Sequence, residues 1–396
     1  MSDRHPLRSN DIREQNEKLV LHLIYSNRGI SQSEVANLTG LKPPTVFRIF
    51  STLEGELLIR PADETVITPD KKGRRPSPYV VVPEAHFSIG VDFWARTAAV
   101  AVFDFSARVI YQRSVNFPAG VDAGTAVDQV IALIEEAVVS SLIPRDKILG
   151  IGIGAPGIVD IETGVVVAYD RIRGMNRFDI RTRIEEHFSA AVVIHNNCSV
   201  IALGAYRYGS VHGETSLVAF LIRSGLGGAF IHDGHLYVNQ GRTAFEIGRI
   251  APIFPSAKSH AHGGLPDDRS LEDYICEDAI LQTARDSAGA ESWEDIDRLL
   301  LEKNRALTEG LSVLGRIFSQ TARNLTHLLN PDAILIISRS QPVSDYFGQE
   351  LRNQMAAAHD EVLVDVKRII PTAYDPLPAC RGAADLVFDD YFALPH

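Results

Sequence analysis

The first sixty residues contain three short segments whose apolar residues repeat with helical spacing. In the segment between residues 12 and 25 the apolar positions follow i, i+1, i+4 and i+5, which places on one face Leu19, Val20, Leu23 and Ile24. Gly29 is a typical residue for ending such a helix. Ser31 followed by Glu34 has the capping-box spacing, so we expect a second helix over residues 32–38 that buries Val35 and Leu38.

A third helix is expected to begin at Pro43-Pro44, because the N–H groups of a first helical turn have no helical partner in any case. Its apolar face consists of Val46, Ile49 or Phe50, and Leu53. The second and third helices are joined by the tight turn Thr39-Gly40-Leu41 and follow a longer helix. This arrangement is typical of a helix-turn-helix, which reads double-stranded DNA.

The third helix would enter the major groove with its first turn leading. The candidate DNA-binding residues point away from its apolar stripe, and they are Lys42, Thr45, Phe47, Arg48 and Ser51. Arg48 can bind a guanine edge or a phosphate, Lys42 and Thr45 can bind phosphates, and Phe47 can contact a thymine methyl group. The alternative is an ordinary three-helix bundle that makes protein contacts.

Two β-rich runs, residues 57–60 and 65–68, flank a turn and predict a wing, so residues 1–70 are expected to form a winged helix-turn-helix domain. Residues 71–85 are expected to be a linker that glycine and proline keep from being helical. Its basic residues are Lys71, Lys72, Arg74 and Arg75. They either lie in a narrow minor groove, where the negative potential is deepest, or are simply solvated.

From residue 86 onward, β-rich runs alternate with helical patterns, of which residues 125–141 and 305–329 are the clearest. Strand-rich starts near residues 87 and 215 indicate an α/β fold with two lobes and a cleft between them. The first lobe is expected over residues 86–198, with residues 381–396 returning to it, and the second over residues 199–380.

Charge is distributed unevenly along the chain. The 396 residues have a net charge of -11, which by itself argues against a nucleic-acid partner. Residues 1–82, however, hold 12 Lys/Arg and 10 Asp/Glu, a net charge of +2, and the remainder has a net charge of -13. An acidic body with a more basic head is therefore expected, and only the head is expected to bind DNA.

Three widely spaced cysteines argue against a disulfide scaffold and favour a cytoplasmic location. No run approaches the about 18 apolar residues of a membrane-spanning helix, and the polar N-terminal residues do not resemble a signal peptide. We therefore expect no membrane partner.

Five segments of the body resemble the ROK (repressor, ORF, kinase) family, in this order: residues 88–92 (SIGVD), 152–160 (GIGAPGIVD), 195–197 (HNN), 224–229 (SGLGGA) and 246–249 (EIGR). The resemblance covers nearly the whole chain. It implies a winged helix-turn-helix joined to a two-lobed, actin-like or sugar-kinase-like body of the ribonuclease H type.

Three departures from the family's kinases argue against phosphotransfer. The kinases follow the first aspartate with two glycines, whereas Asp92 is followed by Phe93-Trp94, and a bulky Trp94 prevents close approach of ATP phosphates. The resemblance places the catalytic aspartate at Asn197, whose carboxamide cannot accept a hydroxyl proton. Residues 338–340 lack the glycine pair that lies near adenosine. Neither enzyme activity nor a cofactor is therefore expected.

The family's zinc site is also absent from the sequence. The resemblance places a histidine ligand at Arg249 and cysteine ligands in the segment after it, and residues 252–269 contain no cysteine. His260 and His262 alone are weak evidence for a metal, so none is expected.

The sugar pocket is partly retained. The resemblance implies that sugar hydroxyls bind to Asn196, Glu246 and Glu272, with Asn197 beside them and Gly157 as a backbone wall. Arg249 adds positive charge where the family has a histidine, and Phe245 adds bulk. One hypothesis is an acidic or otherwise modified sugar effector paired with Arg249. The alternative is that Arg249 forms an internal salt bridge with Glu246 or Glu272 and the site is closed.

These observations together predict a DNA-binding transcriptional regulator, a repressor of carbohydrate uptake or catabolism genes, whose non-catalytic body senses a sugar or sugar derivative. A homodimer or tetramer is expected, because helix-turn-helix proteins pair two heads on one operator. Two alternatives are an active sugar kinase with a DNA-binding head, and a regulator controlled by a docking protein with a vestigial cleft.

Overall fold

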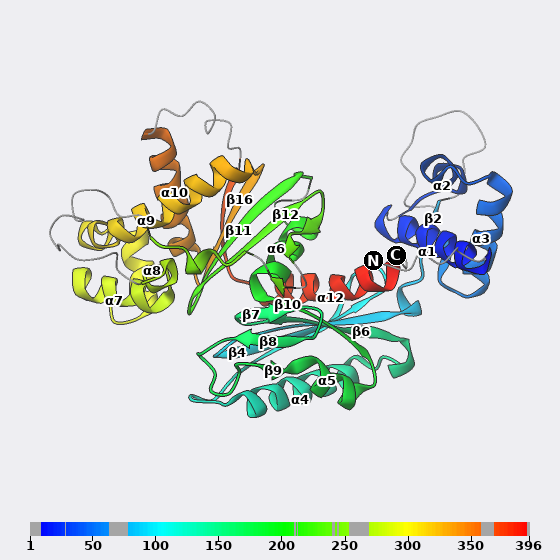
Figure 1. Cartoon of the computed structure of the whole chain (residues 1–396), viewed down its shortest axis with the longest axis horizontal. Coiled ribbons are helices and arrows are strands. Elements are labelled where there is room, and N and C mark those ends of the chain that lie inside the picture. Colours follow the sequence, from blue (N-terminus) through cyan, green and yellow to red (C-terminus); the bar gives the residue numbers. More distant parts are fainter. Residues whose placement is uncertain are drawn as a thin grey trace.

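The computed structural model describes residues 9–27, 29–62, 78–209, 211, 213–239, 242–243, 245–252, 269–357 and 368–393. Figure 1 shows a small helical head beside a two-lobed α/β body. None of the described helices is long and apolar enough to cross a membrane.

The head contains α1 (Ser9–Asn27), α2 (Gln32–Thr39) and α3 (Pro43–Gly55). The expected capping box is present, since Ser31 and Glu34 bond reciprocally at the start of α2, and Gly40 ends α2 with a left-handed φ of +71°. The expected burial of Leu38 is wrong, because its side chain is 65% exposed. Leu38 lies in the last turn of a short helix, beyond the face through which Val35 reaches the core.

The head also contains a two-stranded antiparallel sheet of β1 (Ile59–Pro61) and β2 (Tyr79–Val81). The expected wing run at residues 65–68 and the basic residues Lys71, Lys72, Arg74 and Arg75 lie outside the described residues. Because β2 follows them and pairs with β1, these basic residues belong to the connection between two paired strands of the head. The boundary expected at residue 70 falls inside the same connection.

The first lobe is built on a sheet of order β10-β6-β3-β4-β5. Its strands are β3 (Phe87–Phe93), β4 (Thr97–Asp104), β5 (Val109–Asn116), β6 (Ile148–Ala155) and β10 (Ala191–Asn196). The helices α4 (Ala123–Ser141) and α5 (Ile180–Phe188) pack on one face and bury an apolar core with it. A small sheet of β14 (Val238–Asn239), β15 (Arg242–Thr243), β7 (Ile158–Asp160), β8 (Val165–Ala168) and β9 (Phe178–Asp179) lies at the edge of this lobe.

The second lobe is built on a sheet of order β13-β12-β11-β16-β17. Its strands are β11 (Ser216–Ile222), β12 (Leu226–His232), β13 (His235–Leu236), β16 (Ala333–Ser338) and β17 (Arg368–Ala373). A separate core joins one face of this sheet to α7 (Glu277–Ala288), α8 (Trp293–Leu301), α9 (Arg305–Leu329) and α10 (Gln341–Ala357). The expected two-lobed α/β body is confirmed.

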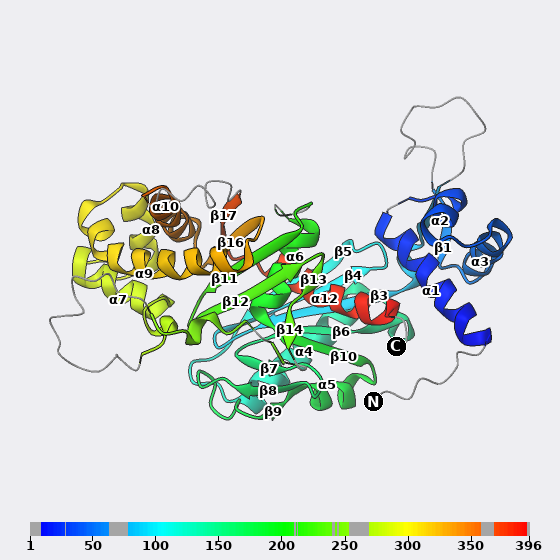
Figure 2. The same ribbon diagram turned by 45° about the horizontal axis from the view of Figure 1, so that its top comes forward.

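Two helices, α6 (Asn197–Tyr208) and α12 (Pro376–Phe392), lie between the sheets, as Figure 2 shows. Glycines allow α12 to approach its neighbours at backbone distance. A Cβ on Gly90 of β3 would lie 1.7 Å from the Cys380 carbonyl oxygen, and one on Gly382 would lie 1.8 Å from the Val200 carbonyl oxygen. Side chains at these glycines would therefore separate α12 from the first sheet and from α6.

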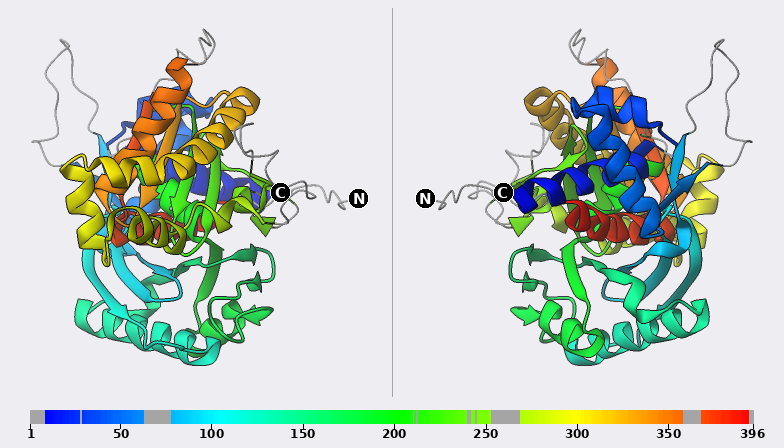
Figure 3. Two further views of the ribbon diagram at one scale, coloured as in Figure 1. Left: turned by 90° about the vertical axis from the view of Figure 1, so that its left-hand side faces the viewer. Right: turned by 90° about the vertical axis from the view of Figure 1, so that its right-hand side faces the viewer.

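The far end of α12 contacts the head (Figure 3). The Tyr25 ring of α1 lies 5.1 Å from the rings of both Phe388 and Phe392, and His22 stacks on Phe392 at 4.9 Å. Phe105 of the first lobe joins the same apolar cluster as the head's own core residues. The head and body therefore share one continuous core through α12.

Candidate functional sites

The helix α3 presents a polar face that nothing else in the described head covers. Val46, Ile49 and Phe50 are buried on one side, while Lys42, Phe47, Arg48 and Ser51 are exposed and Thr45 is half-buried. The Phe47 side chain is 61% exposed, so its ring is free to contact a partner. Four of the five residues predicted to contact DNA thus lie on α3, Lys42 is the residue that precedes its first turn, and the four exposed ones face solvent.

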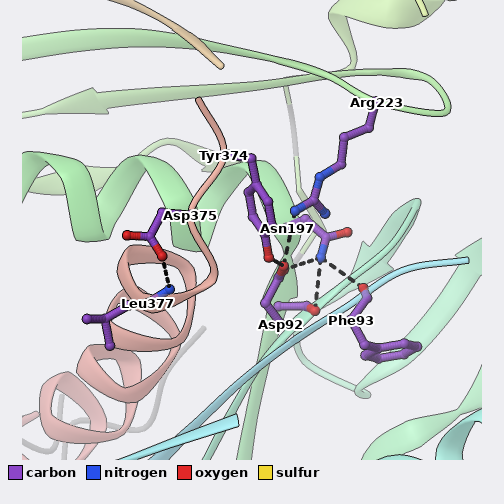
Figure 4. A network of polar contacts seen from close by, with 8 residues as sticks. Asp92, Phe93, Asn197, Arg223, Tyr374, Asp375 and Leu377 are labelled. Atoms are coloured by element: carbon purple, nitrogen blue, oxygen red, sulfur yellow. Dashed lines mark hydrogen bonds and ion pairs between the residues drawn. The ribbon is translucent and has the colours of Figure 1, made fainter. Parts of the chain in front are cut away.

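The interlobe site is centred on Asp92, which is 1% exposed at the end of β3 (Figure 4). Its Oδ1 accepts a hydrogen bond from Asn197 Nδ2 at 2.5 Å. Its Oδ2 accepts hydrogen bonds from Tyr374 Oη at 2.5 Å and from Arg223 Nη2 at 3.3 Å. The four residues come from β3, the first turn of α6, the end of β11 and the segment after β17, so the cluster joins both lobes to their connecting helices.

Arg223 fills the space beside Asp92. Its guanidinium lies 3.8 Å from the centre of the Tyr374 ring and 4.7 Å from that of Trp94. Burial lowers the pKa of Arg223, but the charges and hydrogen-bonding groups of Asp92 and Tyr374 together outweigh it, and the net shift of its pKa is upward. Burial, followed by the charge of Asp92, raises the pKa of Tyr374. Arg223 is therefore charged and Tyr374 protonated at neutral pH.

Asn197 acts here as a donor. Besides Asp92, its Nδ2 donates to the carbonyl oxygens of Phe93 at 3.0 Å and Gly154 at 3.1 Å. An aspartate in this place would direct an oxygen at three other oxygens, so the surroundings select an amide. The amide nitrogen is fully engaged in this cluster, and the residue is only 6% exposed.

Some hydrogen-bonding capacity in this region stays unused. Among the described residues, Arg223 Nη1, Trp94 Nε1 and one carboxyl oxygen of Glu277 are buried without a partner. The Glu277 backbone N–H donates to the Arg223 carbonyl oxygen at 2.7 Å, and burial raises the pKa of the Glu277 carboxyl.

The remaining predicted effector residues come from four places: Asn196 caps the start of α6, Gly157 lies between β6 and β7, Glu246 and Arg249 follow β15, and Glu272 lies in a short helix over Leu271–Asp273. Asn196 donates through Nδ2 to the Gly157 carbonyl oxygen at 3.2 Å and caps α6 through Oδ1. Gly157 has a φ of +75°, and a Cβ there would lie 2.2 Å from the Ala168 carbonyl oxygen, so this wall admits only glycine. The structure thus brings Asn196 and Gly157 into direct contact.

Arg249 faces Glu246 across 3.9 Å, and their side chains are 58% and 37% exposed. Burial, opposed by Arg249, raises the pKa of Glu246, and the charge of the nearby Glu272 raises it further. The internal salt bridge considered from sequence is present, but it is long and open to solvent. Such exposed pairs contribute at most about 1 kcal/mol, so Arg249 is readily available to another anion.

The sequence did not single out Arg223 or Tyr374. Arg223 precedes the glycine-rich turn between β11 and β12, and Tyr374 lies in the short connection between β17 and α12. An arginine directly after the apolar run of residues 216–222 was the one available signal, but its carboxylate partner lies 131 residues away.

Comparisons with known proteins agree with this architecture. The family model described as the ROK family matches residues 88–390. A xylose repressor from Caldicellulosiruptor bescii is 26% identical over 86% of this chain and 87% of its own length. The DNA-binding transcriptional repressor Mlc of Escherichia coli is 21% identical over 72% of this chain and 68% of its own length.

Among solved structures, a ROK family transcriptional regulator homologous to Escherichia coli Mlc has a TM-score of 0.76 at 19% identity, covering 96% of this chain and 98% of that chain. A ROK family glucokinase from Streptomyces griseus, in complex with glucose and AMPPNP, has a TM-score of 0.62 at 21% identity, covering 76% of this chain and 98% of that chain. The regulator structure thus covers nearly the whole chain, including the head, whereas the glucokinase structure covers 76% of it.

Proposed function

This chain belongs to the ROK family, and from that premise we propose that it is a transcriptional repressor of carbohydrate uptake or catabolism genes. The carrying observation has two parts. Lys42, Phe47 and Arg48 are exposed at the start of α3 in the head, and in the body Asn197 stands where the family's kinases have a catalytic aspartate and is held in a buried hydrogen-bond network. Xylose repressors matched over most of their length support a sugar-related regulon.

In the proposed DNA complex, α3 lies in the major groove and Arg48 contacts a base edge or a phosphate. A homodimer or tetramer supplies the two heads that a pseudo-palindromic operator requires. The basic residues Lys71, Lys72, Arg74 and Arg75, in the connection between β1 and β2, add phosphate or minor-groove contacts. Replacing the four by glutamine is expected to lower the salt slope of operator binding by about 0.9 for each phosphate that the variant no longer neutralises.

The body is proposed to be a sensor without phosphotransferase activity. Asn197 cannot act as a general base, and Trp94 and Arg223 occupy the surroundings of Asp92. The effector is proposed to be a sugar or an acidic sugar derivative held by Asn196, Glu246, Glu272 and the Gly157 backbone, with Arg249 pairing an acidic group. Its binding would shift the balance between lobe arrangements and so the spacing of the heads.

The test uses the purified chain, duplex DNA from its own promoter region, and a coupled assay for ADP release with a panel of sugars. We expect specific DNA binding, no ADP release, and release or strengthening of the DNA complex by one sugar or sugar acid. ATP turnover without DNA binding would overturn the proposal in favour of a kinase. DNA binding that no ligand changes, with a protein co-purifying on the body, would favour control by a docking partner.

A further inference from the structure

A cavity of about 310 Å³ lies at the hinge between the lobes. It is bounded by the second half of α6, the strands β16 and β17, and the first turns of α12. Asn196 caps the opposite end of α6, and none of the candidate effector residues lines the cavity. The hinge cavity is therefore distinct from the proposed sugar site.

Part of the lining of the hinge cavity is apolar. Ile201 of α6, Leu335 and Ile337 of β16, and Leu377 of α12 line it. Its helical walls are fixed relative to each other, because a Cβ on Gly204 would lie 2.0 Å from the Pro378 carbonyl oxygen. Two helices in backbone contact cannot close further, so the cavity is built into the packing of α6 on α12.

Two charged side chains line the hinge cavity, Asp375 and Arg381, and among the described residues no ion pair joins them. The Arg381 guanidinium lies 4.7 Å from the centre of the Tyr208 ring and 5.6 Å from that of Phe103. Within the described residues it has no hydrogen bond and no ion pair. The neighbouring Arg207, by contrast, is paired with both Asp385 and Asp389.

The nearby acidic and phenolic groups are already engaged. Asp375 accepts the Leu377 N–H at 3.0 Å as the cap of α12. The Tyr208 hydroxyl donates to Asp385 at 2.8 Å. A half-buried guanidinium between two aromatic rings, facing an apolar cavity, is a site for an anion that also has an apolar body.

We propose that the hinge cavity binds a small organic acid, with its carboxylate on Arg381 and its apolar part against Ile201, Leu335 and Ile337. The volume is at the lower end of the about 300–1,000 Å³ typical of ligand pockets, which suits a molecule the size of benzoate. The inference goes beyond the proposed function, and it does not depend on which sugar, if any, the other site binds.

The experiment is calorimetric titration of the full chain with benzoate and with its uncharged analogue benzamide. Benzoate is expected to bind, and benzamide at least about tenfold more weakly, because only benzoate satisfies Arg381. Arg381→Gln should weaken benzoate binding at least about tenfold, and Ala205→Phe, which places a ring in the cavity, should abolish it. The control Arg305→Gln removes the same charge from an exposed position.

Equal affinity for benzoate and benzamide, unchanged affinity in Arg381→Gln, or absence of benzoate binding to the parent chain would each overturn the inference. Promoter DNA binding by the same preparations shows whether the variants are folded. Since Arg381→Gln adds no bulk, it keeps the test decisive if Ala205→Phe fails to fold. A chain that binds DNA but not benzoate contradicts this site while leaving the proposed function intact.

Discussion

Arg223 of the second lobe and Asp92 of the first form an ion pair whose side chains are 7% and 0% exposed, with Nη2 and Oδ2 3.3 Å apart. Removing one member of a buried pair leaves the other charge uncompensated. We therefore expect Arg223→Met to lower the free energy of unfolding by about 3–5 kcal/mol, measured by urea denaturation.

The control for this substitution is Arg305→Met, which removes an arginine from an exposed pair with Glu309 on α9. It should change the free energy of unfolding by no more than about 0.5 kcal/mol. A loss below about 1 kcal/mol in Arg223→Met, as for exposed pairs, would show that the interlobe pair does not stabilise the fold.

Asn197→Asp restores the carboxylate that a kinase requires, yet we expect no ADP release with any sugar. The new carboxylate would lie against Asp92 and two carbonyl oxygens, so one of the two carboxyl groups would have a raised pKa. When the pKa of a carboxyl is higher in the folded than in the unfolded state, its contribution to the free energy of unfolding is lost as the pH rises through the folded-state pKa. The variant should therefore lose stability relative to the parent between acidic and neutral pH, by thermal unfolding. Sugar-dependent ADP release by this variant would mean that the site still accepts nucleotide.

Arg48→Ala is expected to weaken binding to the cognate promoter DNA by about 1–3 kcal/mol if Arg48 contacts a base. Fluorescence anisotropy at fixed salt, with cognate and scrambled duplexes, measures the effect. Lys42→Ala is the comparison, because removal of a phosphate-binding side chain should weaken both duplexes alike and lower the salt slope. If Arg48→Ala weakens binding to the cognate and the scrambled duplex equally, Arg48 binds the DNA phosphates and specificity comes from other residues.

His195→Leu is expected to change how stability depends on pH. Burial lowers the pKa of His195 to about 4, and its Nδ1 has no partner among the described residues. In the unfolded chain the histidine pKa is about 6.5, so the folded parent resists protonation that the unfolded chain accepts. The parent should therefore lose up to about 3 kcal/mol from this residue as pH falls from 6.5 toward 4, and the variant should not.

The difference between parent and variant isolates this effect. Burial raises the pKa of Asp385 to about 6, and that carboxyl acts in the opposite direction over the same pH range in both proteins. Urea unfolding at several pH values gives the comparison, with His235→Leu, at the exposed start of β13, as the matched substitution. Parallel curves for parent and His195→Leu would contradict the prediction.

The head's helices could be predicted because their signals are local. Ser31 and Glu34 are three residues apart, and the apolar face of α3 is contained in a single helix. The burial of Leu38 was wrongly predicted because helical periodicity shows which residues share a face of α2. It does not show how far along that face the neighbouring helices cover it. The strand partner of β1 was not predicted either, since β2 lies beyond the basic stretch and has no turn signal linking it to β1.

Residues of the candidate site could be predicted only where they lie in segments that resemble family motifs. Asn196, Gly157 and Glu246 lie in segments that resemble family motifs, but Tyr374 is 282 residues from Asp92 and lies in no such segment. Nothing local to either residue shows that a phenol and a guanidinium stack beside a buried carboxylate. That contact is a product of the tertiary fold, in which the segment after β17 returns to the first lobe.

The position of α12 has a consequence for biosynthesis. The head is translated first, yet the aromatic surface on which Tyr25 rests is completed by Phe388 and Phe392, near the other end of the sequence. A nascent head can fold early, as N-terminal domains do, but its contact surface on the body is incomplete until α12 has been synthesised. A polypeptide interrupted before α12 would therefore carry a head that lacks this contact with the body.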